Sequence, residues 1–250
     1  MKVTRDKKGE ADSLKKIKVW LNRRPRSTKG FHVSDLLDPR KTFWGRVKPL
    51  PMTDKQALFF VAGHGHHNVL EAILGPKQKL AGKSDAGEFE KHGILFSPDM
   101  RFKTGPVEIK TSRAMYIKAD EEQDPIDVYK GYLKQEGSYQ ALMGSRTGKL
   151  LVLFLGAVLD KADKWKKTPQ LRQYNVIVEP VEQKKIVASL LQRAKNLTAA
   201  IKKKKWADLP LCDDWKCRDC GWFKDCKPWL QDSKRKGLQD KYNGRYDRKF

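Results

Sequence analysis

The chain of 250 residues contains only four cysteines and no long apolar run. Its longest apolar segment, LLVLFLGAVL at residues 150–159, is too short to cross a bilayer and is typical of a buried central strand. The first thirty residues hold no apolar segment of the kind that a secretory signal needs. No internal repeat is visible. These absences predict a cytoplasmic protein without a membrane span.

Acidic residues are outnumbered, with 30 Asp and Glu against 53 Lys and Arg and a formal net charge of +23. An excess of this size predicts a polyanionic partner, bound with an affinity that falls steeply as the salt concentration rises. The basic residues concentrate in residues 1–29, in Lys202–Lys205 and in the segment from Lys234 to Lys249. A hydrophobic content of 39% still supports a folded core.

The most informative segment is SPDMRFKTGPVEIKTS at residues 97–112. Its second half alternates apolar and polar residues, which predicts a strand with Glu108 and Lys110 side by side on one face. Asp99 lies just upstream, and the intervening Gly-Pro pair predicts a hairpin that returns Asp99 to the side of Glu108. Two carboxylates and an ammonium group then converge on one point. The alternative is an edge hairpin whose polar face is simply solvated.

This combination of groups fits phosphodiester hydrolysis with a hard divalent ion. Mg²⁺ prefers carboxylate oxygens, so Asp99 and Glu108 suit it as ligands. A bound ion neutralises charge on the scissile phosphate and lowers the pKa of a coordinated water. Lys110 would orient that water or stabilise the charge of the pentacovalent state.

Two further segments carry related chemistry, GHGHHNVLE at residues 63–71 and QEGSY at 135–139. Gln135 and Tyr139 are one helical turn apart and share a stripe of a predicted helix. The alternative is a core-facing stripe in which the tyrosine packs and the glutamine makes one buried hydrogen bond. His67 would be a reasonable third ligand for Mg²⁺ or Mn²⁺, the alternative being a structural histidine.

Together the three segments resemble the PD-(D/E)XK nuclease superfamily, and within it the RecB-like branch. That branch includes the RecB and AddB nuclease domains and CRISPR-associated exonucleases with an iron–sulfur cluster. The family pattern is G-x-x-x-H-x-x-L-E on a helix, a D…E-x-K hairpin and Q-x-x-x-Y on a second helix. The matching residues are Gly63, His67, Leu70, Glu71, Asp99, Glu108, Lys110, Gln135 and Tyr139. The resemblance extends over roughly residues 33–230.

The resemblance implies a DNA nuclease that depends on Mg²⁺ or Mn²⁺. The implied catalytic residues are Asp99, Glu108, Lys110, His67, Gln135 and Tyr139, and the implied metal ligands are His67, Asp99 and Glu108. The expected activity is that of an exonuclease on single-stranded DNA or DNA ends, in repair, recombination, phage or CRISPR processing, in a prokaryotic cell or a phage-infected host. No GxxxxGK[ST] motif occurs, so a helicase partner would be a separate chain. Two alternatives stay open, a structure-specific endonuclease and a non-catalytic nucleic-acid-binding or adaptor protein on a nuclease fold.

The cysteines have the spacing C-x4-C-x2-C-x5-C and are Cys212, Cys217, Cys220 and Cys226. In a cytosolic protein such clustering indicates a metal or cluster site rather than disulfides. The same segment contains four tryptophans that would shield the site, Trp206, Trp215, Trp222 and Trp229. Four thiolates suit both a [4Fe-4S] cluster and a structural Zn²⁺. The resemblance favours the [4Fe-4S] cluster, because C-x2-C-x5-C matches the C-terminal cysteines of the family.

One departure from the family concerns the remaining ligand. In the family this cysteine comes from a stretch near the N-terminus that reads S-x-L…C-P-R-K. The corresponding stretch here is VSDLLDPRKTFW at residues 33–44, with Asp38 in place of the cysteine. We infer that Cys212 has taken over this ligand position. The C-terminal lobe is expected to fold back against Ser34–Phe43.

The expected fold is α/β, a restriction-endonuclease-like mixed sheet flanked by helices with a cysteine-rich C-terminal lobe. Strands are expected near residues 92–98, 106–112, 150–159 and 172–179, and helices near 54–74, 123–144 and 181–204. The expected divisions are a basic N-terminal tail (1–30), a nuclease core (31–205), a four-cysteine lobe packing on the core (206–230) and a basic C-terminal tail (231–250). Each tail would be solvated disorder or an arm on nucleic acid, the second with Tyr242 and Tyr246 available to stack on bases.

Overall fold

The computed structural model describes residues 7–22, 30–75, 87–112, 124–155, 158–159, 165–166, 170–213, 216–217 and 220–235. The chain divides into two compact units, each discontinuous in sequence. Unit 1 combines residues 1–30 with 52–188, and unit 2 combines 31–51 with 189–250. The predicted boundary at residue 205 is therefore wrong. The segment 31–51 groups with the cysteines because its side chains pack against theirs, as described below.

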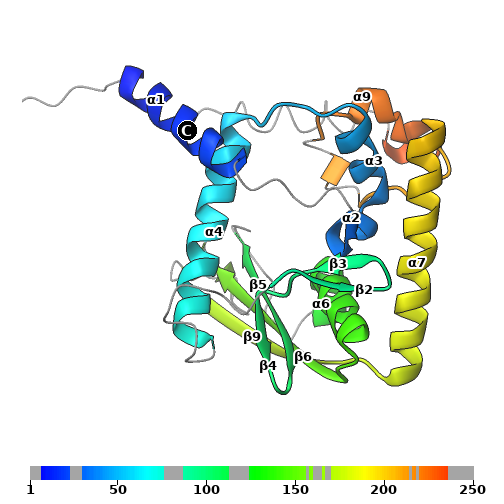
Figure 1. The fold of residues 1–250 in the computed structure, drawn as a ribbon. Helices are drawn as coiled ribbons and strands as arrows, with labels where there is room; N and C mark the ends of the chain where they lie inside the picture. Colours follow the sequence, from blue (N-terminus) through cyan, green and yellow to red (C-terminus); the bar gives the residue numbers. More distant parts are fainter. Residues whose placement is uncertain are drawn as a thin grey trace, which may run out of the picture. The chain divides into compact units, whose positions relative to one another are not determined.

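Unit 1 is built on a four-stranded mixed sheet of order β4-β5-β6-β9 (Figure 1). The strands are β4 (Met100–Phe102), β5 (Gly105–Ser112), β6 (Thr147–Phe154) and β9 (Gln170–Ile177). β5 runs antiparallel to β4 and parallel to β6, and β6 runs antiparallel to β9. The crossover that a parallel pair requires contains the helices α5 (Pro125–Val128) and α6 (Lys130–Met143). The prediction of a mixed sheet flanked by helices is confirmed.

The remaining strands are short. The predicted strand at 92–98 is β3 (Ile94–Phe96), and it pairs in an antiparallel hairpin with β2 (Phe89–Lys91). β6 ends at Phe154, earlier than predicted, and β7 (Val158–Leu159) pairs with β8 (Trp165–Lys166).

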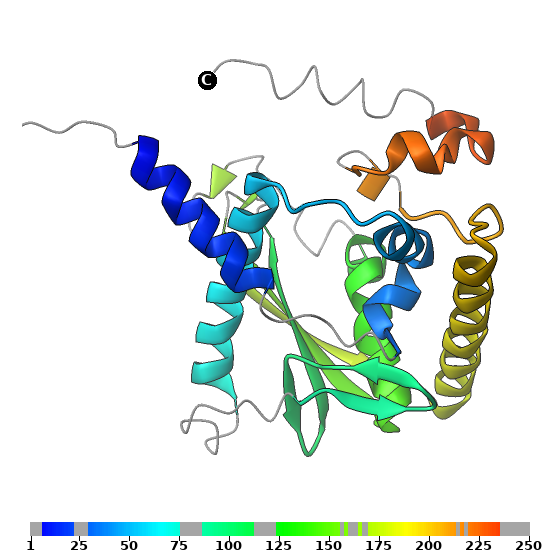
Figure 2. The same ribbon diagram turned by 45° about the horizontal axis from the view of Figure 1, so that its top comes forward.

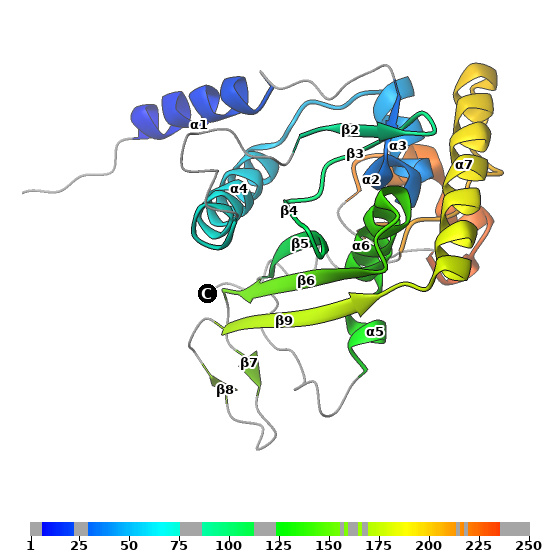
Figure 3. The same cartoon turned by 60° about the horizontal axis from the view of Figure 1, so that its bottom comes forward.

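Helices cover both faces of the sheet (Figure 3). On one face, Leu70 of α4 (Asp54–Leu74) packs against the apolar side chains Met100, Val107, Ile109 and Leu151. On the other face, residues of the α5–α6 segment pack against β6 and β9, with Tyr129, Tyr132 and Leu133 on Leu150, Val152, Phe154, Tyr174 and Val176. α4 begins with a capping box, in which Thr53 and Gln56 satisfy each other's backbone N–H groups.

The turn between β4 and β5 depends on Gly105. Its φ of +133° lies in a region that side chains rarely adopt, and a Cβ at this position would lie 1.9 Å from the carbonyl oxygen of Thr147. Only glycine allows the hairpin to pass this close to the start of β6. The turn therefore fixes how the segment before β4 returns to β5.

Residues 7–22 form the helix α1 (Lys7–Asn22) rather than part of a basic tail. Leu14, Ile17 and Leu21 are partly buried and recur along one face. Lys18 forms an ion pair with Asp54 at the start of α4, and Figure 2 shows the two helices side by side. The tail interpretation failed because the charged residues of this segment hide an amphipathic stripe. The rest of the predicted tail, 1–6 and 23–29, lies outside the described residues.

Unit 2 consists of short elements around the second half of a long helix. They are β1 (Phe31–His32), α2 (Val33–Leu37), α3 (Pro39–Val47), α7 (Pro180–Lys203, shared with unit 1), α9 (Phe223–Cys226) and the 3₁₀ turns η2 (Pro228–Leu230) and η3 (Ser233–Arg235). Its buried side chains include Leu36, Phe43, Leu197, Leu209 and Phe223. The ring of Trp206 lies 6.2 Å from that of Phe43 and 4.9 Å from that of Trp44, so the segment before the cysteines packs on α3. None of the described helices is long and apolar enough to cross a membrane.

Candidate active site and cysteine site

The hairpin places Asp99 beside β5. Met100 pairs with Val107, and the Asp99 carboxylate Oδ2 accepts a hydrogen bond from the backbone N–H of Ile109 at 2.6 Å. The predicted return of Asp99 to the side of Glu108 is confirmed. The hydrogen bond fixes one carboxylate oxygen and leaves the other, Oδ1, to face α4.

Glu108 and Lys110 point to the same side of β5 and form an ion pair. Glu108 is 1% exposed, and its Oε2 has no hydrogen-bond partner. Burial raises the pKa of Glu108 to about 8, with the ammonium group of Lys110 opposing this rise and the carboxylate of Asp99 adding to it. Burial alone would lower the pKa of Lys110, but the nearby Glu108 and Asp99 outweigh it and raise the pKa. Lys110 therefore remains a cation, whereas Glu108 is poorly stabilised as an anion.

α4 brings two further groups to Asp99. His67 Nδ1 lies 3.5 Å from Asp99 Oδ1, and His67, Glu71 and Asp99 each offer a ligand atom within 4.8 Å of the others. Glu71 was absent from the predicted ligand set, although it lies one helical turn after His67 on the same face. Glu108 is not a member of this group of three. Of the predicted ligands, His67 and Asp99 thus lie in one group with Glu71, whereas Glu108 interacts with Asp99 from outside that group.

Gln135 and Tyr139 share a stripe of α6, as predicted. Gln135 Nε2 donates a hydrogen bond to the Tyr139 hydroxyl at 2.8 Å. Tyr139 is 4% exposed, and its ring lies 6.3 Å from that of Phe96. Burial raises the pKa of Tyr139, and the Glu108 carboxylate adds to the rise. The hydroxyl is thus protonated and close enough to Glu108 to feel its charge.

A buried acid on the same helix was missed by the sequence reasoning. Glu136 is fully buried, Gln140 Nε2 donates to its Oε1 at 3.2 Å, and its Oε2 has no partner. Burial raises the pKa of Glu136 to about 9, so it is neutral at pH 7. Gly148 of β6 makes the room, because a Cβ there would lie 2.0 Å from Glu136 Oε1. No local pattern distinguishes this glutamate from a surface one.

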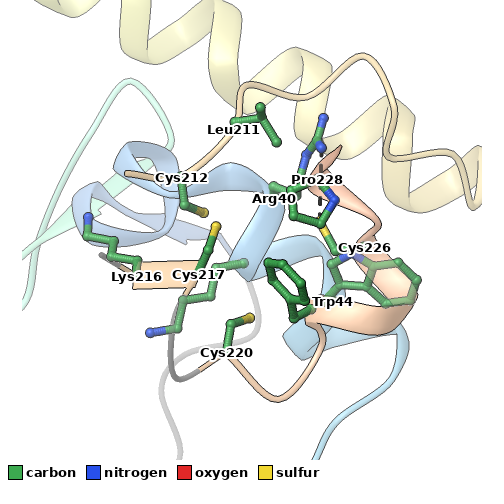
Figure 4. Close-up of a pocket in the computed structure, with 11 residues that line it drawn as sticks. Arg40, Trp44, Leu211, Cys212, Lys216, Cys217, Cys220, Cys226 and Pro228 are labelled. Carbon is green, nitrogen blue, oxygen red and sulfur yellow. Dashed lines mark hydrogen bonds between the residues drawn. The ribbon is translucent and has the colours of Figure 1, made fainter. Parts of the chain in front are cut away.

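The four cysteines line one cavity in unit 2 (Figure 4). The cavity measures about 390 Å³, including space open to solvent, and its other lining residues are Arg40, Lys41, Trp44, Leu211, Lys216, Phe223 and Pro228. None of the four forms a disulfide. Burial raises the pKa of Cys212 to about 12, with the Asp38 carboxylate adding to the rise, and burial also raises the pKa of Cys220. Thiolates at these positions therefore need a bound cation.

Asp38, at the position where the resembled family has a cysteine, is engaged by Lys216. Its two carboxylate oxygens accept hydrogen bonds from Lys216 Nζ at 2.8 and 2.7 Å. Asp38 thus occupies the neighbourhood of Cys212 with its oxygens already paired. This geometry fits the inference that Cys212 supplies the remaining sulfur.

The tryptophans predicted as a shield have mixed roles. Trp206 Nε1 donates to the backbone carbonyl of Cys226 at 3.1 Å, and Trp222 Nε1 donates to that of Lys48 at 2.7 Å. Trp229 packs on Phe223, with ring centroids 5.2 Å apart. None of these three lines the cavity. Trp215 lies outside the described residues.

The start of the predicted C-terminal tail belongs to unit 2. The Gln231 side chain accepts a hydrogen bond from Arg40 at 2.6 Å, and Arg235 is 8% exposed. The prediction of a tail from residue 231 is therefore wrong for 231–235. The sequence pattern assigns Arg235 to solvent, whereas the structure buries it against the sulfur of Cys217. Residues 236–250, including Tyr242 and Tyr246, lie outside the described part of the chain.

The chain matches no family model and no curated protein sequence. Among solved structures, SSO0001 is 19% identical, and the match covers 84% of this chain and 91% of that chain with a TM-score of 0.51. A phage-related exonuclease from Haemophilus somnus 129PT is 13% identical, over 70% of this chain and 96% of that chain, with a TM-score of 0.47. An alkaline exonuclease (LHK-Exo) from Laribacter hongkongensis is 16% identical, over 73% and 95%, with a TM-score of 0.40. The likeness to SSO0001 indicates a shared α/β fold and nothing about activity, and the two weaker likenesses carry no weight for this chain.

Proposed function

We propose that the chain is a metal-dependent DNA nuclease with a restriction-endonuclease-like core of the RecB-like branch. The observation that carries the proposal is the convergence on Asp99 of His67 and Glu71 from α4 and of Glu108 and Lys110 from β5. Carboxylates this close together, with Glu108 buried and Glu71 and Asp99 partly buried, are unfavourable unless a cation compensates them. The raised pKa of Glu108 and its unpartnered Oε2 fit a site built for such a cation.

The residues divide the chemistry among them. His67, Glu71 and Asp99 would hold Mg²⁺ or Mn²⁺, with Glu108 beside Asp99 as a further ligand. Such an ion, when bound, lowers the pKa of a coordinated water and neutralises charge on a phosphate. Lys110, which keeps its proton, would orient the attacking water or stabilise the charge that develops on the phosphate.

Gln135 and Tyr139 of α6 form the other side of the proposed active site. Gln135 would hold the Tyr139 hydroxyl in place, close to Glu108. From this position Gln135 and Tyr139 would contact the DNA substrate or the side chain of Lys110. Removing the hydroxyl in Tyr139→Phe would leave the packing on Phe96 intact and so isolate this role.

The charge of the chain supports a nucleic-acid substrate. Lys202–Lys205 at the end of α7 are all exposed, and the net charge is +23. Exposed lysines of this number neutralise phosphates without reading sequence. The preference for single strands or free ends, and a separate helicase, recombination or CRISPR partner, rest on the family resemblance alone.

We also propose that the cysteines hold a [4Fe-4S] cluster. The four cysteines line one cavity, which supports a shared centre, and four thiolates suit both zinc and a cluster. The resemblance of C-x2-C-x5-C to the C-terminal cysteines of the RecB-like branch favours the cluster. Zinc stays the alternative.

The nuclease proposal is tested with end-labelled linear and circular single-stranded DNA, in Mg²⁺, Mn²⁺ or EDTA. We expect cleavage of the linear strand with either ion and none in EDTA, and circular DNA distinguishes an endonuclease from an exonuclease. Asp99→Ala should abolish cleavage while DNA binding persists, and Arg146→Gln, which removes a surface ion pair with Glu179, should change neither. DNA binding without cleavage under every condition would contradict the proposal and favour an adaptor protein.

The cluster proposal is tested by anaerobic purification, visible absorbance and analysis of iron, sulfide and zinc. A brown protein that contains iron and sulfide is expected, and a colourless one with one equivalent of zinc would overturn the [4Fe-4S] assignment. Cys212→Ser should lose the cofactor as completely as Cys217→Ser, whereas Asp38→Ala should keep it. Retention in Cys212→Ser would overturn the assignment of the fourth ligand.

A further inference from the structure

Two buried arginines of unit 2 donate hydrogen bonds to cysteine sulfurs. Arg40 Nη1 of α3 lies 3.9 Å from Cys226 Sγ, and Arg235 Nη1 of η3 lies 3.4 Å from Cys217 Sγ. The two side chains are 2% and 8% exposed. They come from opposite ends of the sequence of unit 2 and meet the cysteines at two different sulfurs. Neither was among the predicted site residues.

Arg40 is a buried charge whose hydrogen-bond partners are all formally uncharged. Within the described part of the chain, its guanidinium donates to the carbonyls of Ala207 and Leu209, to the Gln231 side chain and to the Cys226 sulfur. No carboxylate is among them. An arginine cannot lose its proton, and an uncompensated buried charge costs several kcal/mol. The sulfur of Cys226 is the one partner that becomes an anion when a metal centre binds.

Arg235, unlike Arg40, has a carboxylate among its hydrogen-bond partners. Its Nε pairs with Asp232 at 3.1 Å, and its Nη1 donates to the carbonyl of Cys212 at 2.7 Å as well as to the sulfur of Cys217. One arginine thus holds the backbone of one proposed ligand and the sulfur of another. The hydrogen bonds that both arginines donate to backbone carbonyls orient their guanidinium groups toward the sulfurs.

We propose that Arg40 and Arg235 are the charge-compensating residues of a four-thiolate centre, each hydrogen-bonded to one ligand sulfur. Four thiolates around a dipositive core, zinc or oxidised [4Fe-4S], leave two net negative charges. Arg40, which has no carboxylate partner among the described residues, and Arg235, whose charge is shared with Asp232, offset them in part. The pair increases the affinity for the cofactor and, in an iron–sulfur cluster, raises the reduction potential, because cations and N–H donors favour the more negative reduced state. This inference rests on the proposed cysteine centre and not on nuclease activity.

The test uses the full chain with Arg40→Gln, Arg235→Gln, the charge-retaining Arg40→Lys and the matched control Arg193→Gln. Arg193 belongs to the same unit and donates to the carbonyl of Leu36 at 3.1 Å, without a sulfur among its partners. Each protein is purified anaerobically and analysed for iron, sulfide and zinc. The rate of metal loss to a chelator is measured, and a potentiometric titration is added if iron is present.

Both glutamine variants should lose the cofactor on the order of tenfold to a hundredfold faster than wild type and the control. A reduced state weakened tenfold relative to the oxidised one shifts a one-electron potential by about 59 mV, here to a more negative value. Arg40→Lys should show a smaller shift of the potential than Arg40→Gln, because lysine keeps the positive charge. If Arg40 had only a structural role, retaining the charge would not reduce the shift. If Arg40→Gln does not fold, the comparison rests on Arg235→Gln and on Arg40→Lys, which keeps the charge.

Retention and potential equal to those of the control in Arg235→Gln and Arg40→Gln would overturn the inference while leaving the centre itself in place. A wild-type protein without bound metal or cluster would overturn both. Failure of DNA cleavage concerns the separate site around Asp99 and would leave these measurements unaffected.

Discussion

Glu136 offers a sharp test of the electrostatics of unit 1. Its carboxyl group is fully buried, with Oε1 accepting from Gln140 and Oε2 without a hydrogen-bond partner. Burial raises its pKa to about 9 from an ordinary 4.5. Glu136→Gln keeps the size and shape of the side chain and is neutral at every pH. The substitution therefore removes the titration and little else.

The expected effect follows from the direction of the shift. Because the pKa is raised in the folded state, folding takes up a proton between pH 4.5 and about 9. The stability contributed by the protonated group is complete below pH 4.5 and is lost as the pH rises towards 9. One proton corresponds to about 1.4 kcal/mol per pH unit, so the variant should gain about 3 kcal/mol on wild type between about pH 6 and pH 8.5.

The measurement is urea unfolding followed by far-ultraviolet circular dichroism at several pH values, with all samples in the same metal state. Glu108 titrates in the same range but is present in both proteins, so the difference between them isolates Glu136 to a good approximation. Glu179→Gln, which removes an exposed carboxylate paired with Arg146, is the control, and because it keeps Glu136 its stability should run parallel to that of wild type. A wild-type and a Glu136→Gln stability that run parallel across this range would refute the reasoning.

The remaining predictions concern the site, the hairpin and the tail. Glu71→Gln should weaken Mn²⁺ binding in calorimetry, with Glu182→Gln on the exposed start of α7 as the control, and an unchanged affinity would remove Glu71 from the site. Because the pKa of Glu108 is about 8, Mn²⁺ binding at pH 7 should release about one proton and strengthen as the pH rises towards 8, and enthalpies that are equal in buffers of different ionisation enthalpy would contradict this. Gly105→Ala should lower the free energy of unfolding by about 3 kcal/mol, whereas Gly65→Ala, with no atoms near its Cβ, should raise it by up to about 1 kcal/mol. Removing residues 237–250 should reduce the slope of log affinity against log salt by about 0.7 for each lost contact with single-stranded DNA. The metal content should not change, because Arg235 remains. An unchanged slope would show that the segment does not touch DNA.

Local periodicity was sufficient for the pairs that lie on one element. Glu108 and Lys110 are two residues apart on a strand, and Gln135 and Tyr139 are four apart on a helix, so backbone geometry alone puts each pair on one side. The hairpin that returns Asp99 followed from the Gly-Pro pair with which β5 begins. His67 is different, because no local rule relates α4 to Asp99, and the family resemblance supplied that link.

Charged residues were the least predictable part. Glu71, Glu136 and Arg235 are all ordinary surface residues by type, yet one joins a ligand group, one is buried and neutral, and one faces a sulfur. The tail predictions failed at residues 7–22 because an apolar stripe lies among the charges, and at residues 231–235 because Arg235 is buried. Sequence pattern assigns a charge to solvent by default, and only the packing of distant segments shows where a charge has been buried.

The sequence by itself determined which residues can bind a divalent cation and which four cysteines can bind a metal or cluster. It also determined the elements on which most of these residues lie, because periodicity and spacing are properties of neighbouring residues. The tertiary structure alone decided which groups compensate one another: Glu71 beside Asp99, Lys216 on Asp38, and Arg40 on Cys226. The physical reason is that the energy of a charge depends on its burial and on its partners. Both are set by segments more than a hundred residues apart in the last two cases.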